Sequence, residues 1–315
     1  TNPMTSMPNT ARIRKALEKL DFLVVQDVYR DVETNQYAHV YFPASVWAEK
    51  EGCHTNTERR INLTVNVLPP FANSKPDLWI FNQLAKRFEN SKLMNFPEVA
   101  EDVFEEMKFL SKGSMPNGKA RNLDISGMSY EKIIQANGIQ WPYRENDNSL
   151  KGQARLYPDG NFPTRNGRAN LLPIRFYNNN EQPCHEYPFW LNSGRVVEHF
   201  HTRTRTGKIG NCNKFSPTAY MEMNPDAAKG LGIEHFSYVR LTSRRGDAVV
   251  LVQLTQRVPR NMVFVPFHFH DCVNRLTLGL LDPHSRQPAF KQCAVRIEPV
   301  DQDWAGKLNV ERRTY

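Results

Sequence analysis

The sequence predicts an α/β segment followed by a compact β-barrel. Two observations support this fold class. Residues 1–95 alternate amphipathic stretches with short, continuous apolar runs. From about residue 186 the apolar runs have strand length, are rich in β-branched and aromatic residues, and are separated by glycine and proline at short intervals.

The first 95 residues are expected to supply helices and parallel strands. A helix is expected to begin after Asn9 or Thr10, either of which is a suitable N-cap. Its apolar face consists of Ile13, Ala16, Leu17 and Leu20. Continuous apolar runs of the kind that a parallel sheet buries on both faces follow at Phe22–Val25 and Ala38–Pro43. A second helix is expected near Pro76 and Asp77, with a stripe of Leu78, Phe81, Leu84, Ala85 and Phe88.

The remaining chain divides into a connector, a barrel and a tail. Residues 96–185 lack a clear period and are expected to form helices, loops and a connector over the surface. The strands expected beyond them are Tyr187–Leu191, Tyr238–Leu241, Ala248–Val252 and Met262–Pro266. Arg244–Asp247 is a hairpin turn signal. The predicted domains are therefore 1–110 (α/β), 111–185 (connector), 186–300 (barrel) and 301–315 (tail).

Composition narrows the classes of partner. Lys and Arg total 41 against 33 Asp and Glu, a formal net charge of +8, which suits nucleic acid, a phosphate-bearing cofactor or a small anion, or simply solubility. The five cysteines are scattered without a CxxC pair, which excludes an iron–sulfur or thiolate zinc motif. No apolar run approaches the roughly 20 residues of a membrane span. The first residues lack a signal peptide layout and an initiator methionine, as expected of a fragment or a processed chain.

The densest cluster of cationic and polar residues runs from Ser193 to Lys208. Three arginines, a lysine and two histidines lie among hydroxyl residues and two glycines. Glycine lets the backbone approach a ligand, and guanidinium groups donate to phosphate or heterocycle acceptors. A solvated basic face has the same composition, so the residues alone leave both interpretations open.

Two other polar stretches are candidates for chemistry. Residues 266–275 hold His268, His270, Asp271 and Cys272, and with His199 and His201 they suggest a four-histidine metal barrel. The glutamate that such barrels place after the first histidine pair is absent. Histidines on the surface, or histidines that hold ligand-binding residues in place, are therefore the favoured interpretation. Lys50, Glu51 and residues 56–60 follow an expected strand, where α/β sheets bind ligands. The chain has no dinucleotide-binding glycine motif, no P-loop and no catalytic triad.

Taken together, these stretches resemble the C-terminal portion of bacterial nitrate reductases of the dimethyl-sulfoxide-reductase family, periplasmic or assimilatory. The resemblance covers about residues 1–300. It is carried by the order and spacing of Thr1–Pro3, Val25–Asp27, Trp47–Gly52 with Asn56–Arg60, Ser193–Thr202, and Asn274–Thr277 through Asp282 and Pro283 to Lys291.

The resemblance implies a fold, a cofactor and its contacts. It implies a partial Rossmann-like α/β domain followed by a six-stranded double-psi β-barrel, wrapped around a bis(molybdopterin guanine dinucleotide) molybdenum cofactor. Residues expected to bind one guanine dinucleotide on the α/β domain are Asn2, Gln26, Asp27, Lys50 and Asp77. The expected pterin-binding loop is Ser193, Gly194, Arg195, Val196, Val197, Glu198, His199, Phe200, His201 and Thr202. Asn274 and Lys291 are further expected contacts, and Phe267 matches a position in the substrate region.

The resemblance also implies what lies elsewhere. The family's cysteines for a four-iron–four-sulfur (4Fe-4S) cluster and for ligating molybdenum have no counterpart here. No catalytic residue or metal ligand is therefore assigned to this chain, and the chain alone is expected to be inactive and to hold the cofactor weakly. Its expected partners are the N-terminal portion of the enzyme, nitrate and an electron-donor protein. Location is expected to be periplasmic or cytoplasmic, with the periplasm favoured.

Two alternatives stay open. A formate dehydrogenase shares the fold, cofactor and loop type, although Val273–Leu278 and the following Asp-Pro segment favour nitrate reductase. A non-catalytic nucleic-acid-binding module would interleave aromatic and basic residues, and only Phe200 lies in the basic run.

Overall fold

The computed structural model describes residues 2–88, 96–114, 118, 122–175 and 181–305. The chain forms two compact units. The barrel unit comprises Thr1–Val25, Tyr29–Tyr41 and Tyr177–Tyr315, and the sheet unit comprises Gln26–Val28 and Phe42–Phe176. The domain boundaries drawn from the sequence stay a prediction.

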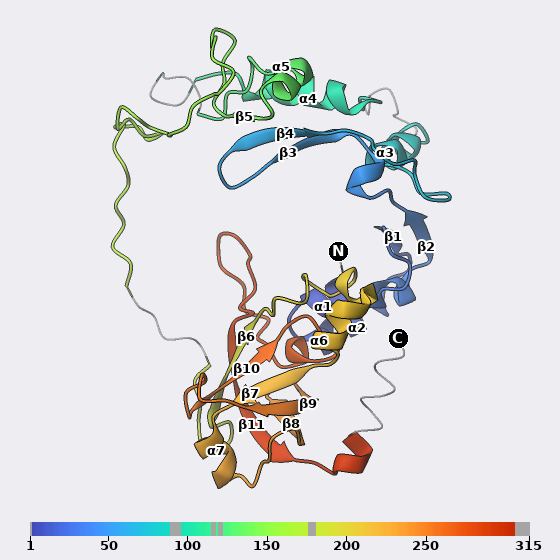
Figure 1. The fold of residues 1–315 in the computed structure, drawn as a ribbon, viewed down its shortest axis with the longest axis vertical. Helices are drawn as coiled ribbons and strands as arrows, with labels where there is room; N and C mark the ends of the chain where they lie inside the picture. The colour runs from blue at the N-terminus through green and yellow to red at the C-terminus, as the bar shows by residue number, and fades with distance from the viewer. Residues whose placement is uncertain (1, 89–95, 115–117, 119–121, 176–180, 306–315) are drawn as a thin grey trace. The chain divides into compact units, whose positions relative to one another are not determined.

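The barrel unit is built around a closed six-stranded barrel (Figure 1). Its strands are β6 (Phe189–Gly194), β7 (Tyr220–Met223), β8 (Tyr238–Ser243), β9 (Gly246–Leu254), β10 (Met262–Pro266) and β11 (Gln292–Pro299). They close in the order β10-β6-β11-β8-β9-β7. β6 pairs in parallel with β10, and β7 with β9, while the other pairs are antiparallel. The expected six-stranded barrel is confirmed as a closed barrel of mixed strands.

Alternation of buried and exposed residues holds the barrel together. Leu241, Val250 and Val263 point inward and are at most 1% exposed, as are most residues at the matching positions of the other strands. Burying a valine or leucine side chain contributes about 1.5–3 kcal/mol. The hairpin turn expected at Arg244–Asp247 is confirmed, because Ser243 pairs with Gly246 around the two-residue turn Arg244-Arg245.

Short helices and turns complete the barrel unit. They are α1 (Pro3–Ser6), α2 (Thr10–Leu17), η1 (Glu33–Tyr37), η4 (Thr206–Lys208), α6 (Gly210–Phe215), α7 (Pro225–Gly230) and η5 (Val273–Arg275). Asn9 is the N-cap of α2, as expected, but its backbone is left-handed (φ 53°) and its side chain makes no capping hydrogen bond. Arg14 on α2 forms an ion pair with Asp271 at 3.3 Å, which connects this helix to the segment before η5.

The two expected parallel strands form a sheet of two strands only. β1 (Val24–Asp27) and β2 (Val40–Pro43) run parallel, because Val40 N donates to Leu23 O and Ala44 N donates to Asp27 O at the same offset. Phe22 and Val24 are 63% and 42% exposed. Burial of this run on both faces, as the sequence predicts, is wrong for the described residues, since only Val25 has enough neighbours to be buried. The Rossmann-like description is not confirmed.

The sheet unit has its own core beneath a three-stranded antiparallel sheet. The sheet consists of β3 (Gly52–Thr55), β4 (Arg60–Thr64) and β5 (Ile139–Gln140), accompanied by η2 (Trp47–Glu49), α3 (Asp77–Ala85), α4 (Ala100–Ser111) and α5 (Tyr130–Gln135). The core residues are Ile61, Phe104, Ile125, Met128, Tyr130, Ile133, Ile139 and Tyr143. The stretch predicted to be a surface connector therefore supplies most of this core. Its apolar residues lie between turns without a period, which is why the sequence pattern did not indicate burial.

Helix α3 begins where the sequence predicts but buries a different face. Pro76 is the N-cap and Asp77 lies in the first turn. Ile80, Asn82 and Ala85 are buried, whereas Phe81, Leu84 and Phe88 of the expected stripe are 56%, 38% and 58% exposed. The expected stripe is wrong at Phe81, Leu84 and Phe88, while Ala85 is buried and Leu78 half-buried. Apolar residues occur on all sides of this helix, so they do not define a single buried face.

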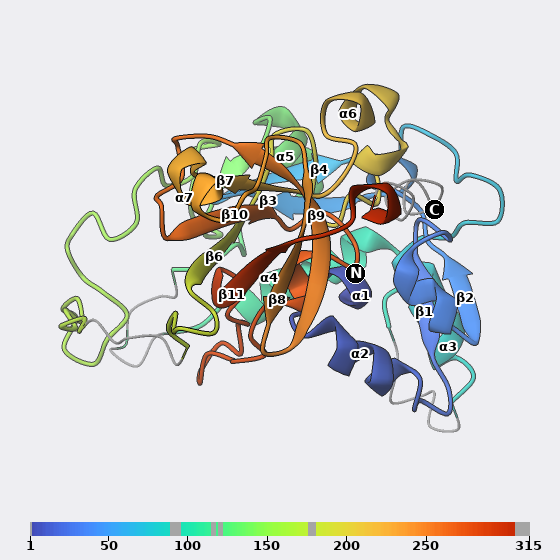
Figure 2. The ribbon, with the colours of Figure 1, turned by 90° about the horizontal axis from the view of Figure 1, so that it is seen from below.

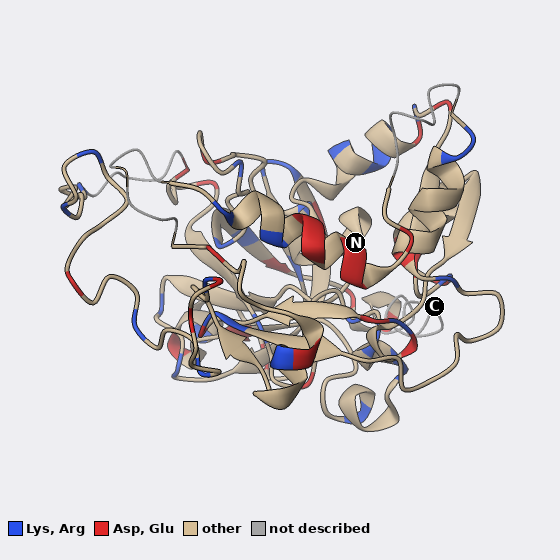
Figure 3. Ribbon diagram, turned by 90° about the horizontal axis from the view of Figure 1, so that it is seen from above, with Lys and Arg blue, Asp and Glu red and all other residues tan. Residues whose placement is uncertain are grey.

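Charge and hydropathy add two general features. In the described ranges no helix combines the length and the apolar character that crossing a membrane requires. Lys and Arg are interspersed with Asp and Glu along the ribbon in the view of Figure 3.

A buried carboxylate fastens the segment before the barrel to the barrel wall. Glu181 accepts hydrogen bonds from both terminal nitrogens of Arg245 (2.6 and 2.8 Å) and from Ala294 N (2.7 Å). Arg245 also donates from Nε to Leu276 O at 2.7 Å. Burial raises the pKa of Glu181, but the bonds from Arg245 and Ala294 outweigh burial and leave that pKa below its usual value.

We expect Glu181→Gln to destabilise the barrel unit by about 3–5 kcal/mol, because the substitution leaves the Arg245 guanidinium buried without its counter-charge. Urea unfolding followed by circular dichroism measures this loss. Glu298→Gln is the matched control, since its pair with Arg296 has side chains 41% and 47% exposed and is worth less than about 1 kcal/mol. Equal losses in both variants would contradict the assignment.

Candidate functional site

The candidate site of the barrel unit starts from the parallel pair β6–β10. Ser193 pairs with Val265 and Gly194 with Pro266, so both strands end at the same edge of the barrel; Figures 1 and 2 show them side by side. Phe267 N donates to Gly194 O at 3.0 Å immediately beyond that edge. The two segments that follow are therefore neighbours. We call residues 195–206 the arginine loop and residues 267–272 the histidine loop.

Position 194 must be a glycine because the ring of a neighbouring phenylalanine lies against it. A Cβ at this position would lie 2.4 Å from Cε2 of the Phe264 ring, closer than side chains pack. Close approach of a ligand is what the sequence predicts for this glycine, but in the structure the Phe264 ring occupies the space that a side chain would need.

Two buried histidines hold the arginine loop from inside. His268 is 0% exposed; its Nε2 accepts from Val196 N at 3.0 Å and its Nδ1 donates to His201 O at 2.6 Å. His199 is 5% exposed and bonds to Ser216 O (2.7 Å) and to the Thr206 hydroxyl (3.1 Å). Burial lowers the pKa of both imidazoles.

The four-histidine interpretation does not fit this arrangement. The rings of His199 and His268 lie 5.9 Å apart and their nitrogens are bonded to protein groups. His270 turns instead to the Thr5 hydroxyl, with Nδ1 at 3.3 Å. Within the ranges that the structure describes, no three histidine, cysteine or acidic side chains are arranged to hold a metal ion.

The three arginines of the arginine loop each lie over a phenylalanine ring. The pairs are Arg195 with Phe267 at 5.7 Å, Arg203 with Phe269 at 5.0 Å and Arg205 with Phe200 at 5.0 Å from guanidinium carbon to ring centroid. Considering described residues only, none of the three forms an ion pair with a carboxylate. Burial lowers the pKa of Arg203, which Glu33 partly offsets. Their positive charge is held by aromatic faces, which leaves N–H donors for an anionic ligand.

Asn2 and Asn274 are brought together through Thr5. Asn2 Nδ2 donates to Thr5 Oγ1 at 3.1 Å and Asn274 Nδ2 donates to Thr5 O at 2.6 Å. Their amide oxygens accept from Thr34 (2.7 Å) and Thr277 (3.0 Å). Both asparagines are buried. Thr5 was not a candidate in the sequence, because a lone threonine in a short helix carries no signal.

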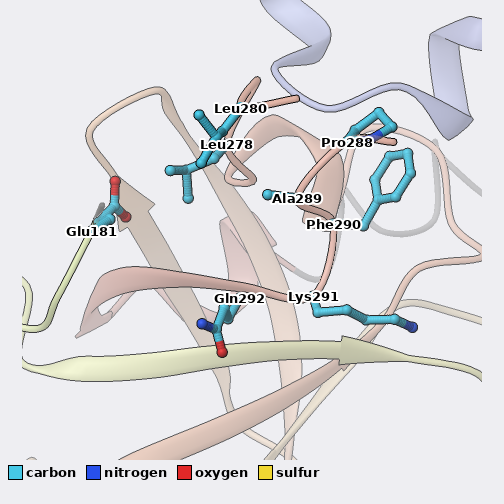
Figure 4. Close-up of a pocket in the computed structure, with 8 residues that line it drawn as sticks. All are labelled: Glu181, Leu278, Leu280, Pro288, Ala289, Phe290, Lys291 and Gln292. Carbon is cyan, nitrogen blue, oxygen red and sulfur yellow. The ribbon is translucent and has the colours of Figure 1, made fainter. Parts of the chain in front are cut away.

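Lys291 lies beside a small cavity at the start of β11. Ser193 N donates to Lys291 O at 2.9 Å and Ser193 Oγ donates to Phe290 O at 2.6 Å, which joins the two expected site residues. A cavity of about 200 Å³ is lined by Glu181, Leu278, Leu280, Pro288, Ala289, Phe290, Lys291 and Gln292. In Figure 4 the Lys291 side chain extends away from Glu181, and the residue is exposed.

The rest of the arginine loop is largely exposed. Val197 is 97% exposed and Phe200 is 51% exposed. Glu198 and Thr202 are half-buried, and the Thr202 hydroxyl lies 2.9 Å from the Thr204 hydroxyl.

The sheet unit assembles a second set of expected residues. Asp77, in the first turn of α3, accepts from Gln26 Nε2 at 2.5 Å and forms an ion pair with Lys50, the residue after η2. Burial raises the pKa of Asp77, but Lys50 and Gln26 outweigh burial and lower it below its usual value. Asp27 is half-buried at the end of β1, and its carbonyl accepts from Ala44 N at 3.0 Å.

The basic residues that follow Lys50 have a structural use. Arg59 has a left-handed backbone (φ 67°) and donates to the carbonyls of Trp141, Gln153 (3.0 Å) and Ala154 (2.8 Å). Arg60 donates to Gly138 O at 2.9 Å. These two guanidinium groups therefore tie the β3–β4 turn to residues 138–154.

We expect Gly194→Ala to destabilise the barrel unit by about 1–3 kcal/mol, because the new methyl group overlaps the Phe264 ring. Phe264→Leu in the same chain should restore part of the loss, since it shortens the opposing side chain. Thermal unfolding of the single and double variants measures both effects. If the double variant lost the sum of the two single losses, the ring contact would not be the cause.

Comparison with known proteins gives matches over nearly the whole chain. The family model of the molydopterin dinucleotide binding domain matches residues 189–294, and that of molybdopterin oxidoreductase matches residues 1–87. The chain is 38% identical over 308 residues to a nitrate reductase of Synechocystis sp., and 36% identical over 300 residues to an F420-dependent formate dehydrogenase subunit alpha of Methanocaldococcus jannaschii. Each alignment covers 95% of this chain and 42% of the relative.

Two further matches agree with these. The chain is 34% identical over 303 residues to an assimilatory nitrate reductase catalytic subunit of Bacillus subtilis, covering 95% of this chain and 41% of that protein. Among solved structures, acetylene hydratase from Pelobacter acetylenicus has a TM-score of 0.67 at 17% identity, over 95% of this chain and 43% of that one. The chain thus spans about two fifths of the length of these relatives.

Proposed function

We propose that this chain, which belongs to the molybdopterin oxidoreductase family, is the portion of a nitrate reductase that holds the bis(molybdopterin guanine dinucleotide) cofactor. The whole enzyme would reduce nitrate to nitrite by two electrons. The observation that carries the proposal is the arginine loop, where three guanidinium groups rest on phenylalanine rings and form no ion pair with a described carboxylate.

The donor set of the loop fits the cofactor. A dinucleotide cofactor carries pyrophosphate oxygens and a heterocycle rich in acceptors, and arginine edges suit both. Residues 189–294, which match the dinucleotide-binding domain, include the arginine loop, the histidine loop and Lys291. Acidic side chains in place of the three arginines would repel the pyrophosphate oxygens of the cofactor.

Each expected site residue has a proposed role. In the barrel unit, Arg195 and its loop from Ser193 to Thr202 would bind the pterin, with Asn274 and Lys291 as further contacts and Phe267 facing the substrate. Asn2 would bind a guanine dinucleotide. In the sheet unit, Gln26, Asp27, Lys50 and Asp77 would bind a guanine dinucleotide. Because Lys50 and Gln26 keep Asp77 ionised, its carboxylate would accept hydrogen bonds from a ligand.

The chemistry at molybdenum would come from the assembled enzyme. When bound, the molybdenum centre exchanges two electrons with the substrate, and this chain's residues bind and orient the group that carries it. The proposed partners are the N-terminal portion of the enzyme, with its four-iron–four-sulfur cluster, and an electron-donor protein. A periplasmic or cytoplasmic enzyme is consistent with this assignment.

Formate dehydrogenase is the second candidate, because a formate dehydrogenase subunit is as similar to the chain as the nitrate reductases are. Val273–Leu278 and the Asp282-Pro283 segment support nitrate. The assembled enzyme, assayed with reduced viologen and nitrate and separately with formate and oxidised viologen, distinguishes the two. Formate oxidation without nitrate reduction would overturn the nitrate assignment and leave the cofactor assignment intact.

We expect Arg195→Ala in the assembled enzyme to lower molybdenum content several-fold, because the cofactor loses a cationic contact of about 1.5–3 kcal/mol. Elemental analysis of purified protein measures it. Arg257→Ala is a control, since Arg257 is a surface arginine paired with Glu222 at 2.6 Å with its own side chain 77% exposed. Unchanged molybdenum in Arg195→Ala would remove this residue from the site.

A further inference from the structure

A single buried side chain spans the arginine loop. His268 is bonded at one nitrogen to Val196, one residue after Arg195, and at the other to His201, five residues further along the loop. Its ring also stacks on the Phe267 ring, with centroids 4.5 Å apart. The guanidinium of Arg195 lies over that same Phe267 ring. The imidazole therefore contacts both ends of the segment that presents Val197, Glu198 and Phe200.

The bonding pattern fixes the tautomer. An imidazole nitrogen that accepts from a backbone N–H has no proton, and one bonded to a carbonyl must donate. His268 is thus neutral, with its proton on Nδ1 and a lone pair on Nε2. His199 has the opposite tautomer, because its Nε2 lies 2.7 Å from the Ser216 carbonyl and its Nδ1 lies 3.1 Å from the Thr206 hydroxyl.

We propose that His268 is the positioning residue of the arginine loop, holding Val196 N–H and His201 C=O through opposite ring nitrogens so that the loop keeps the conformation in which it meets the cofactor. The role of the loop toward the cofactor rests on the proposed function. The bridge itself does not, since both bonds join groups of this chain to one another.

Backbone conformation explains why such a bridge is needed. His201 and Arg203 both have positive φ, 45° and 65°, which costs a residue with a side chain about 1–2 kcal/mol each. A loop with two such residues needs contacts that favour this conformation over extended ones. The bond from His268 to the His201 carbonyl lies at the first of the two, and His199 anchors the loop between the two ends of the bridge.

The bridge is sensitive to protonation. The groups that face His268 are Arg195, His199 and His201, and those that face His199 include Arg203 and Glu198. Burial lowers the pKa of His268 and nearby Arg195 lowers it further, while the hydrogen bond to the His201 carbonyl partly offsets them. A lowered pKa means that, as the pH falls, His268 binds its proton at a higher pH in the unfolded chain than in the folded chain. The bridge therefore contributes fully above the ordinary histidine pKa of about 6.5 and is lost as the pH falls through the lowered value, when Nε2 becomes a donor facing Val196 N–H.

The tautomers can be read directly in the 315-residue chain labelled with ¹⁵N-histidine. At pH 7.5 we expect His268 to show a protonated Nδ1 and an unprotonated Nε2, and His199 to show the reverse. Lowering the pH should leave His268 neutral below the ordinary histidine pKa of about 6.5, because burial lowers the pKa of its ring. A protonated Nε2 on His268 at pH 7.5 would overturn the proposal without any variant.

Two substitutions separate the two ends of the bridge. The amide of His268→Asn lies near the position of Nδ1 and can still donate to His201 O, but it leaves Val196 N–H without an acceptor. The longer His268→Gln places its oxygen near Nε2 and can still accept from Val196. We expect hydrogen exchange of the Val196 amide to accelerate at least about tenfold in the asparagine variant and to stay near the unsubstituted rate in the glutamine variant. His284→Gln is the control, because His284 is exposed.

Equal acceleration at Val196 in both variants would indicate general loss of packing and would overturn the bridge. The link to the cofactor is tested by molybdenum content in the assembled enzyme, which should fall in His268→Asn and be retained in His268→Gln. Retained molybdenum in both variants would overturn the positioning role. The exchange and tautomer measurements use the chain without cofactor, so failure of the nitrate reductase assignment would leave them unaffected.

Discussion

The parallel pairing of β6 with β10 is the constraint on which the barrel unit's candidate site depends. Strands that run in the same direction end at the same edge, so the segments after Gly194 and after Pro266 emerge together although more than 70 residues separate them. An antiparallel pair would send them to opposite ends of the barrel. The stacking of Arg195 on Phe267 and the contacts of His268 follow from this one pairing. The bonds of Ser193 to the residues before β11 follow from the antiparallel pairing of β6 with β11.

Basic side chains of this molecule include one set that pairs with carboxylates and another that stacks on aromatic rings. Lys50, Arg245 and Arg14 face carboxylates, and their charge is balanced within the protein. The three arginines of the arginine loop face aromatic rings, which attract a cation without occupying its in-plane donors. A net charge of +8 therefore says less about partners than the location of these three arginines, which stack on rings and form no ion pair with a described carboxylate.

Several elements could be predicted from sequence because their signals are local. The β8–β9 hairpin, strand β10 and the start of α3 follow from turn residues, β-branched runs and a proline-aspartate pair. Strand β11 was missed because Arg296 and Glu298 interrupt its apolar pattern. Strand β7 was missed because its four residues are too few to show an alternating pattern. Within the site, the sequence indicated the arginines and asparagines. It could not indicate that His268 and Thr5 connect them, since those contacts span 72 and 269 residues.

Glu181 has a consequence for how the barrel is made. Its partners Arg245 and Ala294 lie 64 and 113 residues downstream, so during synthesis this carboxylate leaves the ribosome long before either partner exists. Contacts of such sequence separation form slowly, because the entropy of closing a long loop is lost before the contact is gained. The barrel strands must therefore reach a near-native arrangement before Glu181 can bond to Arg245 and Ala294. Until β11 has been synthesised, the barrel lacks one strand and its apolar interior is exposed. We expect chaperones to bind the nascent chain at this stage.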